Sequence, residues 1–308
     1  MVSERKNILI ITLSNIGDVI LTTPVMASLR SLFPDAKFTV VVGPKAVGLL
    51  EGSREIERLL IYDKFAGWSH KLKLVRELRE EFYDWVVDLR NSALPFLVRA
   101  NRRSPVFRTH RAKSAREQHL EILRMMKFAV GSTQGFDFFS KKDEASLSEK
   151  LKKRGIDPSS DWVVVAPGAG SEAKRWKIEG FQAVLSRLFS EFPFKAMVVG
   201  DQTEKFLGEK LAHPQVVNLC GEINLRELGA LVSRAKLVLT NDSACMHLGY
   251  ELHRPVVAVF GPTDHEKYGR ENQIWRIVRE APPSGLENLP SEKVFRACEE
   301  LLNGIFTH

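Results

Sequence analysis

The sequence has few cysteines and none of the spacings at which cysteines usually act together. Its three cysteines are Cys220, Cys245 and Cys298. Their odd number and wide separation disfavour a disulfide framework, and they also disfavour a CxxC zinc or redox site. We therefore expect three reduced, buried thiols.

The sequence also lacks long apolar runs. No stretch approaches the roughly 18 uninterrupted apolar residues of a membrane-spanning helix. The first residues, MVSERKN, lead into only a short apolar run, and no signal-peptide cleavage site follows it. These absences predict a cytoplasmic protein.

Patterns typical of metal and dinucleotide binding are missing as well. The chain has no D-x-D pair and no His/Cys/Glu cluster at zinc spacing, so we expect no metal. The turn after the first predicted strand has Gly17 but not the G-x-G-x-x-G series, and no carboxylate ends the second strand at Gly43. NAD and FAD are therefore disfavoured.

What is present is the composition of an ordinary globular protein, with 44% apolar and 27% charged residues. A length of 308 residues favours two domains. Continuous apolar runs alternate with amphipathic segments twice along the chain, which predicts two doubly wound parallel sheets covered by helices. The predicted strands are 7–13, 37–42, 85–89, 162–166, 194–199, 216–219, 237–240 and 256–260. The predicted helices are 19–33, 69–82, 178–191, 203–212, 224–234, 244–252 and 291–305.

A polar stretch at about 140–160, which includes a predicted polar helix ending at Gly155, is interpreted as the linker region between the domains. We assign residues 1–150 to the first domain and 151–290 to the second. The last segment, 291–308, is predicted to be a helix with room to cross back to the first domain. Two such domains facing each other would form a cleft lined by the carboxyl ends of strands, where open parallel sheets bind ligands.

The loop after the first predicted strand carries a carboxylate, Asp18. It stands near the start of a helix, where a negative charge is favoured. One interpretation is a helix N-cap. The other is a general base that accepts a proton from a sugar hydroxyl as that oxygen attacks an anomeric carbon.

Two loops of the second half are suited to phosphate. After the strand 162–166, the glycine-containing turn Gly168-Ala169-Gly170 precedes Lys174 and Arg175, a combination that predicts an anion site without the Walker A spacing. Lys174 is the candidate for neutralising a leaving diphosphate. After the strand 237–240, a helix start provides free N–H groups for phosphate oxygens, and its candidate donor-binding residues are Asp242, Ser243, Ala244 and His247.

The positive charge is concentrated in one segment. Residues 1–150 contain 25 basic and 18 acidic residues, whereas residues 151–308 contain 20 of each, which together give the net charge of +7. Between Arg99 and Arg116 there are seven basic residues and no acidic one. We call 99–116 the basic segment. Its candidate acceptor-binding residues are Arg102, Arg103, Arg108, Arg111, Lys113 and Arg116.

Taken together, these loops resemble the ADP-heptose:lipopolysaccharide heptosyltransferases, glycosyltransferase family 9, which have the GT-B fold. The resemblance is carried by Gly17-Asp18-Val19 with Thr23-Pro24, by Pro167-Gly168-Ala169 with Lys174-Arg175-Trp176, and by Asn241-Asp242-Ser243 with Met246-His247 and Phe260 to Asp264. These motifs extend over nearly the whole chain.

The resemblance implies an inverting, metal-independent transfer of heptose from ADP-heptose to the Kdo or heptose of the lipopolysaccharide inner core. It matches Asp18 to the catalytic base, Lys174 to the diphosphate-stabilising lysine and Glu204 to a glutamate that holds the nucleoside. His119, in Gln118-His119, matches an acceptor-domain motif. No cofactor is implied. With a phosphorylated lipid acceptor, the basic segment would attract the protein to the anionic cytoplasmic face of the inner membrane.

Three alternatives stay open at this level. A family 9 transferase could use another nucleotide sugar or acceptor, and Ala244, where the family usually has glycine, makes the donor sugar the least secure assignment. A non-catalytic sugar-nucleotide sensor would keep the donor loops without needing Asp18. A nucleic-acid-binding protein would use the basic segment, but aromatic residues are not interleaved with it and no RRM, KH or helix-turn-helix signature is present.

Overall fold

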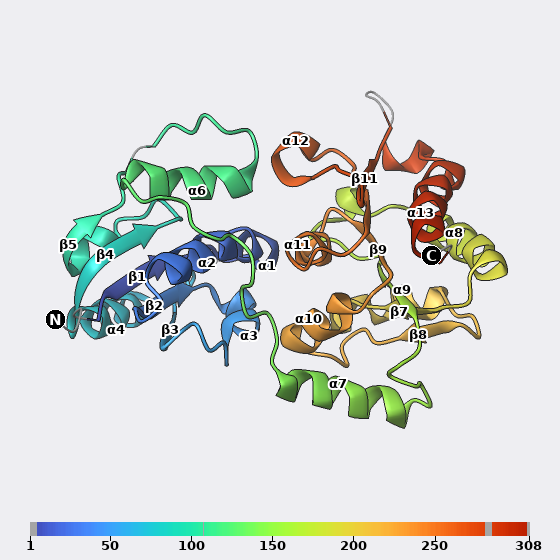
Figure 1. Ribbon diagram of the computed structural model, residues 1–308, viewed down its shortest axis with the longest axis horizontal. Helices are drawn as coiled ribbons and strands as arrows, with labels where there is room; N and C mark the ends of the chain where they lie inside the picture. Colours follow the sequence, from blue (N-terminus) through green and yellow to red (C-terminus); the bar gives the residue numbers. More distant parts are fainter. Residues whose placement is uncertain (1–4, 107, 281–284, 307–308) are drawn as a thin grey trace. The chain divides into compact units, whose positions relative to one another are not determined.

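The computed structural model describes residues 5–106, 108–280 and 285–306. The chain divides into two compact units, residues 1–138 and 139–308, and each contains its own parallel sheet (Figure 1). The predicted fold class, two doubly wound α/β domains, is confirmed. None of the described helices is long and apolar enough to cross a membrane.

The division lies before helix α7 (Lys141–Lys153) rather than after it. The predicted linker of 140–160 is therefore mostly a helix of the second unit, which packs against α10 (Leu225–Ser233). A buried carboxylate fixes this contact: Glu227 accepts hydrogen bonds from Ser146 Oγ at 2.6 Å and from Lys150 Nζ at 2.7 Å. Helix α7 has the polar composition of a linker because part of its contact with α10 is made by polar and charged side chains.

The sheet of the first unit has the order β3-β2-β1-β4-β5, with all neighbouring strands parallel. Its strands are β1 (Asn7–Ile11), β2 (Lys37–Val42), β3 (Arg58–Ile61), β4 (Phe82–Asp88) and β5 (Arg99–Arg103). Its helices are α1 (Ile16–Ile20), α2 (Thr23–Leu32), η1 (Pro44–Ala46), α3 (Val47–Leu50), α4 (Trp68–Arg79), α5 (Leu94–Leu97) and α6 (Ala115–Met125).

The predicted helix 19–33 is two helices. Pro24 lies in the first turn of α2, where a missing N–H costs nothing but where the preceding helix cannot continue. The hydroxyl of Thr22 donates to the carbonyl of Val19 at 2.6 Å, which satisfies an end of α1. The short α1 that results carries Asp18 in its first turn.

Both faces of the first sheet are covered. Leu9 and Ile11 of β1 pack with Leu74 and Leu78 of α4 in one core cluster. On the opposite face Trp85 of β4 contacts the rings of Phe33 and Phe128, which follow α2 and α6. Because β1 is buried on both faces of the sheet, its sequence is a continuous apolar run.

The second sheet has the order β11-β10-β9-β6-β7-β8, again fully parallel. Its strands are β6 (Trp162–Ala166), β7 (Lys195–Val198), β8 (Val216–Asn218), β9 (Leu237–Asn241), β10 (Val256–Val259) and β11 (Trp275–Val278). Its other helices are η2 (Glu172–Lys174), α8 (Ile178–Glu191), η3 (Gln202–Glu204), α9 (Lys205–Lys210), α11 (Ala244–Glu251), α12 (His265–Tyr268), η4 (Leu286–Asn288) and α13 (Ser291–Phe306).

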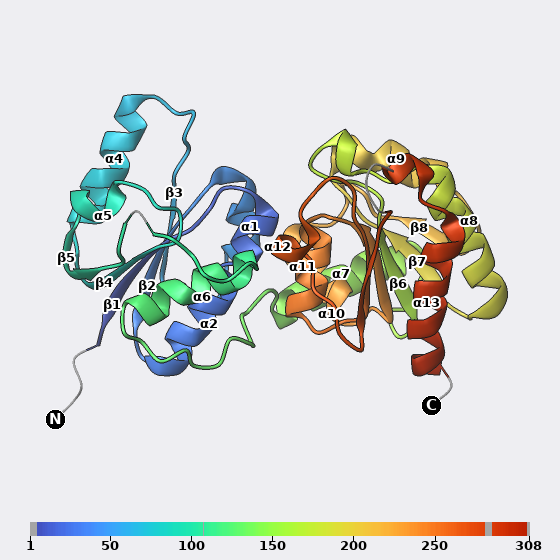
Figure 2. The same cartoon turned by 90° about the horizontal axis from the view of Figure 1, so that it is seen from above.

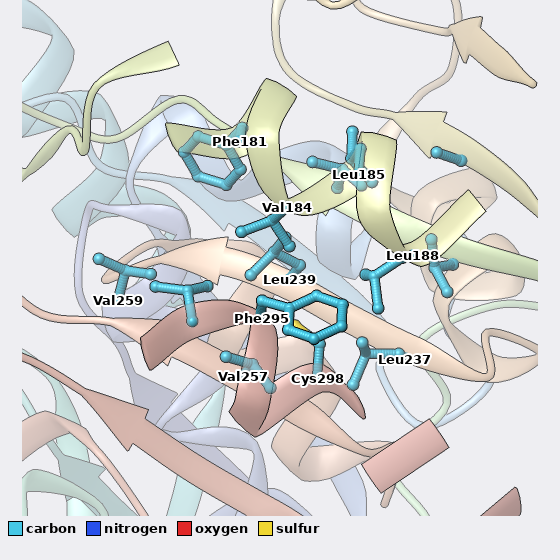
Figure 3. Packing of buried hydrophobic residues seen from close by; sticks show 14 of the residues in the cluster. Phe181, Val184, Leu185, Leu188, Leu237, Leu239, Val257, Val259, Phe295 and Cys298 are labelled. Carbon is cyan, nitrogen blue, oxygen red and sulfur yellow. The ribbon is translucent and has the colours of Figure 1, made fainter. Parts of the chain in front are cut away.

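Helix α13 belongs to the second unit. Figure 3 shows Phe295 and Cys298 of α13 between α8 and the strands β9 and β10, in one apolar cluster. Burial of a side chain as large as Phe295 stabilises the fold by about 1.5–3 kcal/mol. The helix predicted at 291–305 is thus present, and it packs on its own sheet. All three cysteines are reduced and buried, as predicted.

The strand orders determine where ligands can bind. In each unit the chain first adds strands on one side of the starting strand and then adds the rest on its other side. The carboxyl ends of β1 and β4 therefore flank the switch point of the first unit, and those of β6 and β9 flank that of the second. Ligands of doubly wound sheets bind at such points.

Candidate active site

A buried amide holds the two loops at the switch point of the second unit together. The side chain of Asn241, at the end of β9, donates to the carbonyl of Pro167 at 2.7 Å and accepts from the backbone N–H of Trp176 at 3.1 Å. It is fully buried. The loop after β6 is thereby fixed to β9. The sequence analysis did not assign Asn241 a role; the available signal was an amide directly after an apolar strand.

Lys174 lies at this switch point, paired with the carboxylate of Asp242. Its Nζ donates to Oδ2 of Asp242 at 2.8 Å and lies 6.0 Å from the centre of the Tyr268 ring. Asp242 is 5% exposed, whereas the Lys174 side chain is 34% exposed. An ammonium has three donors, so Asp242 can hold Lys174 in place while the exposed side binds an anion.

Two glycines near this switch point lie against the carboxylate of Glu204. A Cβ at Gly168 would overlap the carboxylate of Glu204, and a Cβ at Gly200 would lie 2.7 Å from Glu204 Oε2. These two glycines therefore make room for the Glu204 carboxylate, and the binding of phosphate by the loop after β6 stays a prediction. Of the predicted phosphate loop, Gly168 and Ala169 are buried and Gly170 is exposed.

Glu204 is consequently a half-buried acid. Its carboxylate accepts from the N–H of Asp201 at 3.2 Å and lies 3.7 Å from Nη2 of Arg175. Burial raises the pKa of Glu204 above its usual range, against the opposing effects of these two neighbours. Glu204 is the last residue of η3, directly before α9, whereas the sequence predicted one helix over 203–212.

The start of α11 completes the arrangement in the second unit. Ser243 is its N-cap residue, and Ser243 Oγ is 2.9 Å from Thr240 Oγ1. No side chain caps this helix, which leaves its first N–H groups available to a ligand. Ala244 is the first residue of the helix and is partly exposed.

Asp18 lies at the switch point of the first unit. It is in the first turn of α1, and Asn15, not Asp18, is the N-cap residue. The Asp18 carboxylate accepts a hydrogen bond from Asn15 Nδ2 at 2.9 Å and is partly exposed. The interpretation of Asp18 as an N-cap is therefore wrong.

Two arginines converge on the same switch point. Arg90 Nη1 donates to Ser14 Oγ at 3.2 Å, and Arg108 Nη1 donates to the carbonyl of Asp88 at 2.6 Å. The Asp88 carboxylate is buried and accepts from the N–H groups of Arg90 and Ser92. Arg90 was not predicted, although a basic residue directly after a buried strand was visible in the sequence.

Comparison with known proteins identifies the family. The family model of glycosyltransferase family 9 (heptosyltransferase) matches residues 71–288, more than half of the chain. The chain belongs to glycosyltransferase family 9.

Relatives and solved structures agree with this assignment. The family 9 chain is 29% identical over 277 residues to lipopolysaccharide heptosyltransferase 3 of Escherichia coli, covering 81% of this chain and 82% of that one. The structure of E. coli ADP-heptose lps heptosyltransferase II superposes with a TM-score of 0.80 at 19% identity, covering 97% and 99% of the two chains. The structure of E. coli heptosyltransferase WaaC with ADP gives a TM-score of 0.76 at 21% identity, covering 96% and 99%. The GT-B fold and glycosyltransferase activity are thus established.

The basic segment of this family 9 enzyme does not form one cluster. Arg102 is exposed on β5, and Arg103 is used internally, since its guanidinium donates to the carbonyls of Pro95, Val98 and Ala100. Arg108 lies at the switch point. The remaining predicted acceptor residues are Arg111 and Lys113, exposed before α6, and Arg116 and His119, partly buried on α6.

Arg116 is held inside its own unit. Its guanidinium donates to Glu117 Oε1 at 3.1 Å and to Thr133 Oγ1 at 2.9 Å. Arg103 and Arg116 thus have structural partners, whereas Arg108 donates to the carbonyl of Asp88 at the end of β4. Within residues 5–106, 108–280 and 285–306, no three His, Cys, Asp or Glu side chains are placed to bind a metal ion.

His247 of the family 9 enzyme is a buried, neutral imidazole. It is 4% exposed, and its ring contacts Tyr250 and Tyr268. No group in the described part of the chain hydrogen-bonds to its Nδ1. Burial lowers the pKa of His247 to about 4, against the attraction of Asp242. The residue therefore presents an uncharged ring beside the Lys174–Asp242 pair at neutral pH.

This burial predicts a pH dependence of stability. The pKa of His247 is about 4 in the folded protein, whereas the usual pKa of histidine is 6.5, so between these values the unfolded chain binds a proton that the folded chain excludes. The free energy of unfolding must therefore fall as the pH decreases through this window. Relative to His247→Gln, the wild type should lose about 2–3 kcal/mol more between pH 7 and pH 4.5. Urea unfolding of both proteins measures this, and equal losses would contradict it.

Proposed function

We propose that this family 9 enzyme transfers heptose from ADP-heptose to the Kdo or heptose of a lipopolysaccharide inner core, with inversion and without a metal. The observation that carries the proposal is the Lys174–Asp242 ion pair at the second switch point, between the loop after β6 and the uncapped start of α11. The relatives' names give the sugar and the acceptor class.

The donor is proposed to bind to the second unit. Lys174 and the first N–H groups of α11 would bind the diphosphate, because both provide positive charge or donors to phosphate oxygens. Glu204 would accept hydrogen bonds from the nucleoside hydroxyls. Its position between Gly168 and Gly200 fixes its carboxylate where a neighbouring nucleoside can meet it. The solved neighbour with bound ADP supports an adenine nucleotide.

In the transfer step Asp18 acts as the general base. It takes the proton of an acceptor hydroxyl, whose oxygen forms the new bond to the anomeric carbon while the bond from that carbon to the phosphate oxygen breaks. ADP leaves with the electron pair, and Lys174 neutralises its charge. Attack from the face opposite to the leaving group inverts the anomeric centre.

The acceptor is proposed to bind to the first unit. Arg90 and Arg108 lie beside the loop bearing Asp18, and guanidinium groups bind phosphate and carboxylate with paired hydrogen bonds. A phosphorylated, acidic saccharide on a lipid anchor fits these groups. The enzyme would then work at the anionic cytoplasmic face of a membrane.

A second candidate donor is favoured by Ala244. This methyl group stands at the first position of α11, where it restricts how closely a sugar-phosphate can approach the helix backbone. A nucleotide sugar other than ADP-heptose is therefore the main competitor.

Nucleotide binding tests the donor. We expect ADP to stabilise the protein against heat more than UDP or GDP does. At a concentration of 100 Kd, ADP should raise the free energy of unfolding by about 2.7 kcal/mol relative to the protein alone. The measurement is a thermal melt with each nucleotide, followed by a transfer assay with a donor panel and a lipid A–Kdo acceptor. Greater stabilisation by UDP or GDP would refute the ADP-heptose assignment.

A further inference from the structure

Three large apolar side chains are exposed together at the start of α4. Phe65 is 85% exposed, Trp68 79% and Leu72 66%. Trp68 and Leu72 are one helical turn apart and so lie on one face of α4, and Phe65 stands in the turn just before the helix. The core takes the other face of α4, through Leu74 and Leu78. We call Phe65, Trp68 and Leu72 the α4 tip.

Most of the charged residues around the α4 tip are basic. Two carboxylates also lie there, since Asp63 accepts from the N–H of Phe65 at 2.9 Å and Glu77 lies 3.9 Å from Lys73 Nζ. Between Lys64 and Arg76 there is no acidic residue. Lys64 Nζ lies 4.7 Å from the centre of the Phe65 ring, and Lys71 Nζ lies 5.4 Å from that of Trp68. Lys73 and Arg76 are also exposed. Apolar side chains with basic residues around them are complementary to a surface whose outer layer is negatively charged and whose interior is apolar.

Further exposed apolar residues adjoin the other end of α4. Arg79 Nε donates to the carbonyl of Leu97 at 2.7 Å, which joins α4 to α5. Phe96 of α5 is 64% exposed and Leu97 41%. Figures 1 and 2 show α4 and α5 as neighbours within the first unit, beside the edge strand β5. Phe96 and Leu97 thus form a second exposed apolar group, close to a strand that carries the exposed Arg99 and Arg102.

We propose that the α4 tip inserts into the surface of an anionic lipid bilayer. Tryptophan and phenylalanine stabilise helices at the depth of lipid headgroups, and lysine and arginine around them bind the anionic phosphates. A second copy of the chain fits less well, because two faces with the same basic border repel each other. A nucleic acid would use the charge but would leave Leu72 and Trp68 in water or against phosphate.

This inference rests on the proposed function in one respect, that the acceptor is carried by a lipid. It differs from the earlier expectation in assigning the membrane contact to α4 instead of the basic segment. Arg103, Arg108 and Arg116 have partners inside their own unit, whereas the α4 tip consists of exposed side chains.

Vesicle flotation tests the proposal. The full-length protein is mixed with vesicles of phosphatidylcholine alone or with one third phosphatidylglycerol. We expect the wild type to float with the anionic vesicles and only weakly with the neutral ones. The triple variant Phe65→Ser/Trp68→Ser/Leu72→Ser should bind the anionic vesicles at least about tenfold more weakly, and each of Lys64→Gln, Lys71→Gln and Lys73→Gln should weaken binding roughly fivefold.

Matched controls come from the second unit. Phe206 is 46% exposed on α9, so Phe206→Ser removes an exposed aromatic residue elsewhere. Lys142→Gln, Lys152→Gln and Lys153→Gln on α7 remove the same charge from exposed positions. Both sets should leave vesicle binding unchanged. Unfolding curves of the triple variant should match the wild type, because its three residues are exposed.

Three outcomes would overturn the inference. The first is equal vesicle binding by the triple variant and the wild type, and the second is equal binding of neutral and anionic vesicles by the wild type. The third is a triple variant that loses self-association in sedimentation while it still binds vesicles. Transfer to a deacylated, water-soluble acceptor separates the two proposals. The triple variant should keep this activity, whereas a wild type that floats but transfers nothing would refute the proposed function alone.

Discussion

Asp18→Asn is expected to reduce sugar transfer by about 10²–10⁴-fold while leaving ADP binding unchanged. Asparagine keeps the size of the side chain and its place beside Asn15, but an amide cannot accept a proton from the attacking hydroxyl. The donor-binding residues belong to the other unit, so the thermal stabilisation by ADP should persist. Initial rates and single-turnover transfer, measured beside ADP melts, check both parts.

Two controls define the meaning of that result. Asp35→Asn changes an exposed carboxylate of the same unit and should leave transfer unaltered. Asn15→Ala removes the hydrogen bond that orients Asp18, and its smaller loss should appear in kcat rather than in donor binding. Unchanged transfer in Asp18→Asn would remove this residue as the base and would favour a non-catalytic sugar-nucleotide sensor.

Lys174→Met has the second largest expected effect. Removing the ammonium that pairs with Asp242 should lower kcat by about 10²–10³-fold, because the charge that develops on the leaving ADP is no longer neutralised. ADP affinity should fall as well, since the same ammonium contacts the diphosphate before and after transfer. Rates at saturating donor and nucleotide titrations separate these two losses.

The Lys174 experiment needs a variant that removes an ambiguity. In Lys174→Met the buried Asp242 carboxylate loses its partner, and an unpaired buried charge destabilises a protein. The double variant Lys174→Met/Asp242→Asn avoids this while still lacking the ammonium, so it should fold normally and remain as inactive. Lys177→Met, at an exposed lysine nearby in the sequence, should stay active. Recovery of activity in the double variant would show that Lys174 serves the fold and not the leaving group.

The central strands and the edge strand β8 could be predicted from sequence, while the other three edge strands could not. Strands such as β6 and β9 are buried on both faces and therefore appear as short apolar runs with clear ends. Strands β3, β5 and β11 were missed because they lie at sheet edges, where exposed arginines are tolerated. β5, with the sequence RANRR, has no hydrophobic signal at all. Its pairing with β4 arises from the backbone.

The loops of the candidate site could be located from sequence, but their internal contacts could not. Strand-to-helix loops after β1, β6 and β9 are identifiable once the strands are. That Lys174 contacts Asp242, 68 residues later, depends on which strands are neighbours in the sheet. For the same reason the roles of Asn241 and Arg90 were not assigned, and the close approach of Gly168 to Glu204 was not foreseen.

The two glycines around Glu204 have a practical consequence for changing the sugar nucleotide that this enzyme accepts. A library that diversifies Gly168 or Gly200 would consist largely of proteins with a displaced Glu204, because any side chain there overlaps its carboxylate. Gly170 has no atom within 4 Å of where a side chain would begin, and Ala244 is partly exposed. Randomising positions 170 and 244 together would therefore explore new donors while most of the library still folds.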